Sequence, residues 1–173
     1  YRNLNAHTFI DHFPMPDMQE QLRRLGRAKF FTSIDLFAGY NQVKIKEEVQ
    51  HKAAFITPFG LFEPLLMPFG LVNAPAVFNR VMSYVRDRVD QFPVSVYMDD
   101  IVIGGETPEE HVIAFARVIE VLDEANLGIK CQKTALVRTE TEALGHKITR
   151  DGISKMDSYL QAVRDLTPLQ NPT

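Results

Sequence analysis

The sequence predicts an α+β fold in which helices pack on one face of an antiparallel sheet. Short apolar runs typical of strands are separated by tight-turn residues, and two longer segments repeat apolar residues at helical spacing. These segments do not follow the regular strand–helix–strand order of a parallel sheet. With 173 residues, 45% of them hydrophobic and 24% charged, the chain is long enough for one domain with a buried core.

The first part of the chain alternates helical and extended patterns. Residues 17–26 place Met18, Leu22 and Leu25 at helical spacing, and Gly26 is expected to cap this helix. We expect strands over 28–36, 42–46, 52–57 and 61–66, turns at 37–41 and 58–60, and a Pro- and Gly-rich loop over 67–75.

A longer helix is predicted from Asn73, which is a suitable N-cap. Valines recur every four residues along it, at Val77, Val81, Val85 and Val89. This spacing places them on one face of the helix, which we expect to be buried.

A second long helix begins with a capping signal. Thr107 is the expected N-cap, Pro108 takes the first helical position, and Glu110 closes a capping box. Its apolar face is expected to carry Val112, Phe115, Ile119 and Leu122. Beyond it we expect short strands over 134–137 and 142–149, a turn at Asp151-Gly152, and a last helix near 158–166.

Two adjacent acids interrupt an apolar stretch at residues 96–104, VYMDDIVIG. The stretch is typical of strand, turn and strand, with Asp99 and Asp100 at the turn. One interpretation is a solvated hairpin tip, because Asp tolerates the backbone angles of tight turns. The other is a metal site, because like charges can lie together when a divalent cation neutralises them.

Asp35 is the candidate third carboxylate. It ends the apolar run FFTSID directly before a turn, as the other acids end theirs. By residue type alone it is more typical of a turn-starting or helix-capping Asp. If the two strands lie side by side, the three acids share one site of the two-metal type.

Composition limits the classes of function. The formal net charge of −3 disfavours a domain whose whole surface grips nucleic acid, but a local basic groove remains compatible with it. Cys131 is the only cysteine, so there is no disulfide framework or zinc-binding cysteine cluster, which fits a reducing compartment. No apolar run reaches the roughly 18 residues of a membrane span and no signal peptide opens the chain, so no membrane partner is expected. Because the chain begins at Tyr1 rather than Met, we expect a fragment of a longer polypeptide.

Several blocks, in order, closely resemble the reverse transcriptases of gypsy-like long-terminal-repeat retrotransposons, which are related to the retroviral enzymes. They are YRNLN, SIDLFAGYNQVKI, AAFITPFGLFEPLLMPFGLVNAPAVFNRVM, VYMDDIVIG and EALGHKITRDGI. The resemblance implies the palm of a right-handed polymerase, with part of the fingers, over residues 1–167. Residues 168–173 would begin the connection to a thumb.

The resemblance also implies cofactors and partners. Two Mg²⁺ ions are expected, with Mn²⁺ able to substitute, together with an RNA and DNA template-primer and deoxynucleoside triphosphates. The rest of the fingers, the thumb, the connection and the RNase H domain would be other parts of the same polyprotein. An intracellular location is expected, either in cytoplasmic retroelement particles or in the nucleus.

Metal ligands follow from matching positions in the family. Asp35 and Asp99 would be the principal ligands of both ions, and Asp100 would complete the catalytic set. The backbone carbonyl of Leu36 would be a further metal ligand.

Nucleotide contacts are carried over in the same way. The amides of Ala38 and Gly39 would face the triphosphate, and Tyr40 would be the steric gate that excludes a 2′-hydroxyl. Phe69 would line the nucleotide pocket, and Met98 would touch the nucleotide and the primer end. By residue type alone, Tyr40 and Met98 are equally typical of the core.

Lys133 matches a basic residue that can protonate the departing pyrophosphate, although a solvated surface lysine is the simpler interpretation. His146 could likewise be a half-exposed strand residue. The template and primer contacts implied by the resemblance are Arg2, Asn5, Ala74, Pro75, Leu144, Gly145 and His146.

The leading hypothesis is RNA-directed DNA polymerisation, in which a primer 3′-hydroxyl attacks the α-phosphorus of a deoxynucleoside triphosphate. A viral RNA-dependent RNA polymerase shares the palm, but Tyr40 and the order of the blocks disfavour it. The non-enzymatic alternative is an inactive or repurposed retroelement fragment that still folds and binds nucleic acid.

Overall fold

The computed structural model describes residues 1–156. The helix expected near 158–166 and the segment 168–173 therefore lie outside the described residues. The helices are α1 (Arg2–Ala6), α2 (Met18–Arg23), α3 (Glu47–Gln50), α4 (Ala74–Arg88) and α5 (Pro108–Glu124), with short 3₁₀ turns η1 (Gly39–Gln42), η2 (His51–Ala53) and η3 (Cys131–Lys133). The strands are β1 (Phe30–Asp35), β2 (Phe55–Thr57), β3 (Gly60–Phe62), β4 (Val94–Tyr97), β5 (Asp100–Gly105), β6 (Ala135–Arg138), β7 (Glu140–Ala143), β8 (His146–Thr149) and β9 (Gly152–Lys155).

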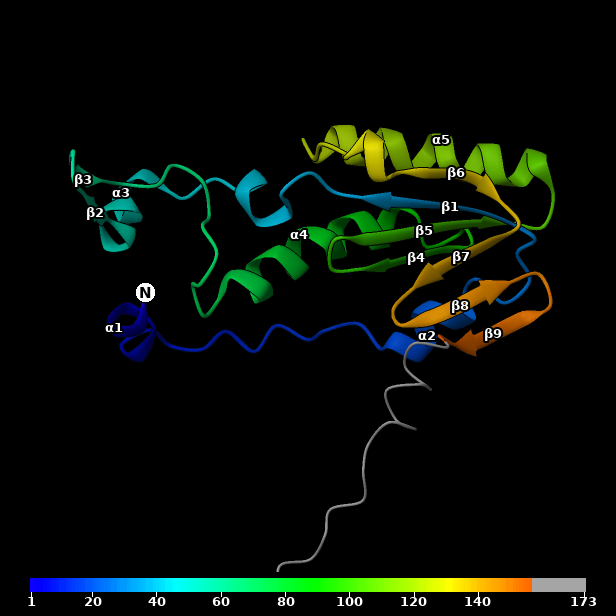
Figure 1. Cartoon of the computed structure of the whole chain (residues 1–173), viewed down its shortest axis with the longest axis horizontal. Coiled ribbons are helices and arrows are strands. Elements are labelled where there is room, and N and C mark those ends of the chain that lie inside the picture. Colours follow the sequence, from blue (N-terminus) through cyan, green and yellow to red (C-terminus); the bar gives the residue numbers. More distant parts are fainter. Residues whose placement is uncertain (157–173) are drawn as a thin grey trace, which may run out of the picture.

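The central sheet has the strand order β4-β5-β1-β6, and its neighbouring strands are antiparallel. A second sheet, β7-β8-β9, and the β2–β3 hairpin are separate from it. Figure 1 shows the central sheet and α5 at one end of the molecule, with α1, α3 and the hairpin at the other and α4 between them. This arrangement confirms the predicted α+β class.

One face of the central sheet is covered by α4 and α5. Ile101 and Ile103 of β5 are fully buried in this layer, together with Phe78 and Met82 of α4 and Val118 of α5. The predicted four-residue repeat of α4 forms part of this layer, because its valines all pack in or against the same cluster. Burial of such side chains contributes about 1.5–3 kcal/mol each.

The opposite face is covered by α2 and by the β7-β8-β9 sheet. Val102 of β5 points into this second cluster, where it meets Leu22, Leu25, Phe31 and Ile148. Because successive residues of a strand face opposite sides, β5 can be apolar at consecutive positions only when both faces are buried.

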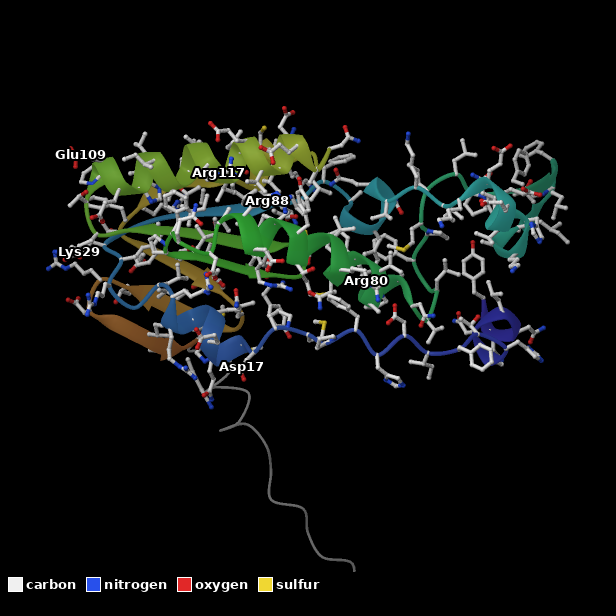
Figure 2. All side chains as sticks on the ribbon, turned by 180° about the vertical axis from the view of Figure 1, so that it is seen from behind. Asp17, Lys29, Arg80, Arg88, Glu109 and Arg117 are labelled. Carbon is white, nitrogen blue, oxygen red and sulfur yellow. The ribbon has the colours of Figure 1, made fainter. Side chains whose placement is uncertain are left out.

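Two of the helix starts are fixed by side-chain caps. The carboxylate of Asp17, labelled in Figure 2, accepts a hydrogen bond of 2.8 Å from the Glu20 amide at the start of α2. The Thr107 hydroxyl accepts one of 3.2 Å from the Glu110 amide, which confirms the predicted cap of α5. Asn73 precedes α4 as predicted, but its side chain makes no capping bond there.

Long-range hydrogen bonds bind the N-terminal segment to α4 and the loop before it. The Asn73 side-chain amide donates to the Phe9 carbonyl at 2.8 Å, and that of Asn79 donates to the Pro14 carbonyl at 2.6 Å. Arg80, labelled in Figure 2, lies 2.9 Å from the Asp11 carboxylate. The extended chain before α2 therefore runs alongside α4 in Figure 1.

Ion pairs join α4 to α5. Glu124 of α5 lies 3.9 Å from Arg88 of α4 and 3.6 Å from Arg117 of its own helix, and Figure 2 shows both arginines where the helices meet. All three side chains are partly exposed, so we expect these pairs to add at most about 1 kcal/mol each.

Several local predictions are wrong; the strands expected over 52–57 and 61–66, for example, are the shorter β2 and β3. The helix α2 ends at Arg23 with Arg24 as its C-cap, so Gly26 is not the cap. Residues 42–46 do not form a strand, because Gln42 belongs to η1 and α3 starts at Glu47, which leaves room for only one bridge, at Lys44.

The predicted apolar face of α5 is displaced by one position at its start. Val112 is 60% exposed, whereas His111 next to it is buried. Gly105 lets this part of the helix lie close to the sheet, and the buried His111 has a hydrogen-bond partner there in Thr32. Residues 142–149 form two strands rather than one, and β9 pairs with β8 after the expected turn.

No helix within residues 1–156 combines the length and the apolar character needed to cross a membrane.

Candidate active site

The three predicted acids lie together at one end of the central sheet. Asp35 is the last residue of β1, and its register partner on the neighbouring strand is Asp100, the first residue of β5. Asp99 lies in the turn that joins β4 to β5, and Figure 1 shows this turn beside the end of β1. The expectation that two strands present their acids side by side is therefore confirmed.

The turn is a two-residue hairpin, because Tyr97 pairs with Asp100 across it. Met98 takes the left-handed conformation, with φ of 53°. This conformation is unfavourable for a side chain of that size, and such strain concentrates at functional sites. It holds Asp99 at the tip of the hairpin, directly next to Asp100.

Mutual repulsion shapes the ionisation of this cluster. Partial burial raises the pKa of the Asp100 carboxyl, and the charges of Asp99 and Asp35 raise it further. Lys133 acts in the opposite direction on the same pKa. The site therefore favours a positive charge between the carboxylates.

Lys133 supplies such a charge to one of them. Its Nζ lies 3.0 Å from Oδ2 of Asp35. This hydrogen bond, together with the charge of Asp35, raises the pKa of Lys133. Lys133 is thus part of the acid cluster, although it is 98 residues away from Asp35 in the sequence (133 − 35).

The donor chemistry of the cluster suits a hard divalent cation, which prefers carboxylate and carbonyl oxygens. Within residues 1–156, however, no group of three or more His, Cys, Asp or Glu side chains is arranged as a closed metal centre. Lys133 holds one of the oxygens of Asp35. The acids therefore offer the type of oxygen ligand that the expected metal ions prefer. Their side chains would have to move closer together to bind an ion.

The Leu36 carbonyl is available as a further oxygen donor. Leu36 forms a bridge with Ile129, but the hydrogen bonds of that bridge come from the flanking residues. The Phe37 amide donates to the Gly128 carbonyl at 2.9 Å, and the Lys130 amide donates to the Asp35 carbonyl at 2.8 Å. This pattern leaves the carbonyl of Leu36 outside the bridge.

The loop after β1 turns sharply toward α4. Ala38 is left-handed, with φ of 48°, and Gly39 begins η1. A Cβ at Gly39 would lie 3.0 Å from the ring of Phe78, so any larger residue would push the loop away from α4. The loop predicted to face the triphosphate therefore lies directly on α4.

A pocket of about 130 Å³ opens between this loop and the acids, lined by Gly39, Tyr40, Phe69, Phe78 and Asp99. The ring of Tyr40 lies 5.3 Å from that of Phe69 and 5.2 Å from that of Phe78, measured between centroids. Burial, and then the charge of Asp99, raises the pKa of the Tyr40 hydroxyl, so it is neutral at ordinary pH. The structure thus places Tyr40 and Phe69 together with Asp99, as the family positions suggest.

Sequence reasoning missed three residues that support the site. Phe78 forms the back of the pocket, and it could have been noticed as the one aromatic residue on the buried face of α4. Gln42 donates to the carbonyls of Phe37 and Gly128, at 2.6 and 3.0 Å, and so fastens the loop to the segment before Lys133. The third, Gln21, holds the strand β4 (see Discussion), and neither glutamine carried a signal in the sequence.

The expected template and primer residues form two groups, one where α1 meets the start of α4 and one at the β7–β8 turn, and neither includes the acids. Arg2 is exposed on α1, whereas the Asn5 amide side chain holds the loop before α4 through Gly70 and Val72. Ala74 is only 2% exposed, so of the pair that begins α4 only Pro75 faces solvent.

The second group lies at the β7–β8 turn. Leu144 and Gly145 are both left-handed, and Nδ1 of His146 lies 2.8 Å from the Leu144 carbonyl. His146 is half-buried and begins β8.

Comparison with known proteins identifies the family. The family described as "Reverse transcriptase (RNA-dependent DNA polymerase)" matches residues 1–148. The chain belongs to the reverse transcriptase family. This confirms the resemblance inferred from the ordered blocks.

Relatives of this reverse transcriptase chain are polyproteins of retrotransposons. The retrovirus-related Pol polyprotein from transposon 297 of Drosophila melanogaster is 39% identical over 163 residues, 94% of this chain and 15% of that polyprotein. The corresponding polyprotein from transposon gypsy of the same organism is 34% identical over 166 residues, 95% of this chain and 16% of the polyprotein. The chain therefore spans about one sixth of these relatives.

Solved reverse transcriptases share the fold. The foamy viral protease-reverse transcriptase in complex with RNA/DNA hybrid has a TM-score of 0.81 and 29% identity, covering 96% of this chain and 22% of that one. Its relative in complex with double-stranded DNA has a TM-score of 0.86 and 27% identity, covering 96% of this chain and 29% of that one. The predicted palm-and-fingers architecture is thereby confirmed.

Proposed function

We propose that the chain carries the polymerase site of a retrotransposon polyprotein and transfers a nucleotide from a deoxynucleoside triphosphate to a primer 3′-hydroxyl on an RNA template. The observation that carries this proposal is the register pairing of Asp35 with Asp100, with Asp99 in the turn beside the Tyr40 pocket. Membership of the reverse transcriptase family gives that arrangement its chemical meaning.

The acids would hold two divalent ions, for which we propose Mg²⁺, with Mn²⁺ as a substitute. Asp35, Asp99 and the Leu36 carbonyl would be the main ligands, and Asp100 would complete the set. When bound, such ions activate the attacking hydroxyl and neutralise the charge of the leaving phosphates.

The remaining residues would position the nucleotide. The backbone amides of Ala38 and Gly39 are fixed donors that suit a triphosphate. The Tyr40 ring would lie under the sugar and exclude a 2′-hydroxyl, and Phe69 and Met98 would border the base and the primer end. Nζ of Lys133 is close enough to the acids to give a proton to the departing pyrophosphate.

The proposed partners are an RNA and DNA template-primer, deoxynucleoside triphosphates, and the other parts of a polyprotein. Foamy viral relatives were solved with RNA/DNA hybrid and with double-stranded DNA, which supports the first of these. We propose residues 1–167 as palm and partial fingers, with fingers strands, a thumb, a connection and an RNase H domain elsewhere in the polyprotein. Cytoplasmic retroelement particles or the nucleus are the proposed location.

Primer extension on an RNA template, with Mg²⁺ or Mn²⁺, tests this function in a polyprotein segment that contains the chain. We expect Asp99→Asn to lower extension by at least about 100-fold, because it removes a charge on which the preorganised site depends. Asp151→Asn is the matched control, because that exposed acid lies in the β8–β9 turn.

Extension that survives Asp99→Asn would show that the acid cluster is not the catalytic site. If the wild-type segment does not extend a primer but still binds nucleic acid, the alternative of an inactive or repurposed fragment holds instead.

A further inference from the structure

We propose that Lys133 is the resident counter-cation of the acid cluster and competes with a divalent metal ion for Asp35. Its ammonium group occupies Oδ2 of Asp35, and it leaves that oxygen when the metal binds. This role rests on the proposed function, because it concerns the same metal site. It concerns metal entry, whereas proton transfer to pyrophosphate would come after the chemical step.

Backbone hydrogen bonds fix the positions of both residues of the Lys133–Asp35 ion pair. The Lys130 amide donates to the Asp35 carbonyl at 2.8 Å, and the Lys133 amide donates to the Lys130 carbonyl at 3.0 Å. These bonds place η3 directly beside the end of β1. The backbone of Lys133 is therefore held in place, with its side chain within reach of the Asp35 carboxylate.

Competition follows from the geometry of the oxygen. Nζ of Lys133 lies at hydrogen-bond distance from Oδ2, at 3.0 Å, whereas Mg²⁺ binds a carboxylate oxygen at about 2.0–2.1 Å. An ammonium group and a divalent ion on one oxygen would repel each other strongly. The lysine therefore has to leave when the metal arrives.

Departure of the lysine is easy, which makes the competition modest. The Lys133 side chain is 61% exposed and that of Asp35 is 30% exposed, so water can replace the ion pair. Lysine also has a flexible four-carbon stem that can swing into solvent. Exposed ion pairs of this kind change an equilibrium by a few-fold.

Within residues 1–156, the other two acids of the cluster, Asp99 and Asp100, have no ion-pair partner of this kind. The lysine therefore engages one oxygen of Asp35 and leaves the other two acids open. The acids of the described residues form no closed metal centre, and the principal ligand of β1 is the one already engaged.

Direct Mn²⁺ binding to the 173-residue chain tests the proposal without primer, template or nucleotide. The free Mn²⁺ signal in electron paramagnetic resonance gives the affinity, at about 0.15 M salt so that distant charges are screened. We expect Lys133→Met to bind Mn²⁺ about two- to fivefold more tightly than wild type, because the competitor is removed. Lys133→Arg, which keeps the ion pair, should bind like wild type.

Lys130→Met is the matched control for loss of a positive charge. It lies in the same segment but forms no ion pair with the acids in the described structure, so it should leave Mn²⁺ affinity unchanged. In an Asp35→Asn background, Lys133→Met should no longer change the affinity, because the shared oxygen has lost its charge. Circular dichroism confirms that each variant is folded.

Equal Mn²⁺ affinities of Lys133→Met and Lys130→Met would overturn the proposal, as would a chain that binds no Mn²⁺ in any variant. If the predicted shift is found but no primer is extended, the counter-cation role stands and the polymerase proposal fails. If primers are extended but Lys133→Met leaves Mn²⁺ affinity unchanged, the polymerase proposal stands and the counter-cation role fails.

Discussion

Asp99 and Asp100 are neighbours in the sequence but have different surroundings in the structure. Asp99 lines the pocket with Tyr40, whereas Asp100 pairs with Asp35 in the sheet. Burial raises the pKa of Asp100, and the charges of Asp99 and Asp35 raise it further. The two carboxylates therefore have different neighbours, and Asp99 is the one that lines the pocket proposed for the nucleotide. Their shared site could be predicted from strand ends, but this difference in neighbours could not.

The aromatic side of the pocket leads to a prediction for Tyr40. Tyr40→Val should relax the selection against ribonucleotides by about 10- to 200-fold, because the ring that would clash with a 2′-hydroxyl is removed. The ratio of ribonucleotide to deoxynucleotide incorporation measures this in an extension-competent polyprotein segment. Tyr84→Val, on the exposed face of α4, is the control and should leave the ratio unchanged.

Unchanged ribonucleotide use in an active Tyr40→Val protein would mean that Tyr40 is not the gate. A wild-type protein that already prefers ribonucleotides would favour the RNA-dependent RNA polymerase alternative.

At the scale of elements, the edge strand β4 depends on side chains from two helices. The Val96 amide donates to Oε1 of Gln21 in α2 at 2.9 Å, and the Val96 carbonyl accepts from Arg86 of α4 at 3.4 Å. Edge strands have unpaired backbone groups, and when buried these need partners. Because β4 leads into the turn that contains Asp99, these contacts from α2 and α4 help to hold that turn in position.

Gln21 therefore has a measurable structural role. Gln21→Leu should lower the free energy of unfolding by about 1–3 kcal/mol, because the buried Val96 amide loses its acceptor. Urea unfolding measures the change. Gln19→Leu, an exposed position of the same helix, is the control. If both variants lose equal stability, the hydrogen bond to β4 is not what Gln21 contributes.

Prediction of elements succeeded where the signal was local. The start of α5 and the hairpin at the acids depend on cap and turn residues a few positions apart, and both were predicted. The strand expected over 42–46 is reduced to a single antiparallel bridge, in which Lys44 faces Leu66, because η1 ends at Gln42 and α3 begins at Glu47. The alternating pattern indicated the pairing but not how short it would be.

At the scale of the whole molecule, a buried histidine joins the sheet to the helix layer. The Thr32 hydroxyl of β1 lies 2.8 Å from Nε2 of His111 in α5, and the same oxygen accepts from the Val137 amide of β6 at 3.1 Å. A Cβ at Gly105 would lie 2.6 Å from the Cβ of His111, so only glycine lets α5 start so close to β5. Burial lowers the pKa of His111, so the folded chain favours the neutral imidazole more than the unfolded chain does.

The stability of the whole fold should depend on pH through this residue. Below about pH 6.5 the unfolded chain binds a proton at His111 more readily than the folded chain, so stability is lost as the pH falls. His111→Gln should remove this part of the pH dependence while keeping a hydrogen-bonding group for Thr32. Unfolding free energies between about pH 7.5 and pH 5 measure it, with the exposed His51→Gln as control.

The raised pKa of Asp100 acts in the opposite sense, because its contribution is lost as the pH rises through its folded value. This contribution of Asp100 is present in the wild type and in the His111→Gln and His51→Gln variants, so it cancels in the comparison. An unchanged slope in His111→Gln would show that His111 does not control acid stability.

The sequence by itself determined the class of fold, the family, the hairpin at Asp99 and the placement of Asp35 at a strand end. The fold class, the hairpin and the strand end follow from periodicity, caps and turns, which act over a few residues, whereas the family follows from the resemblance of the ordered sequence blocks. Only the tertiary structure decided that Lys133 meets Asp35, that Phe78 lies behind Tyr40, and that Gln21 holds a strand 75 residues away. These contacts arise when separate elements pack into one core, and no local pattern records which polar side chain will find its partner there.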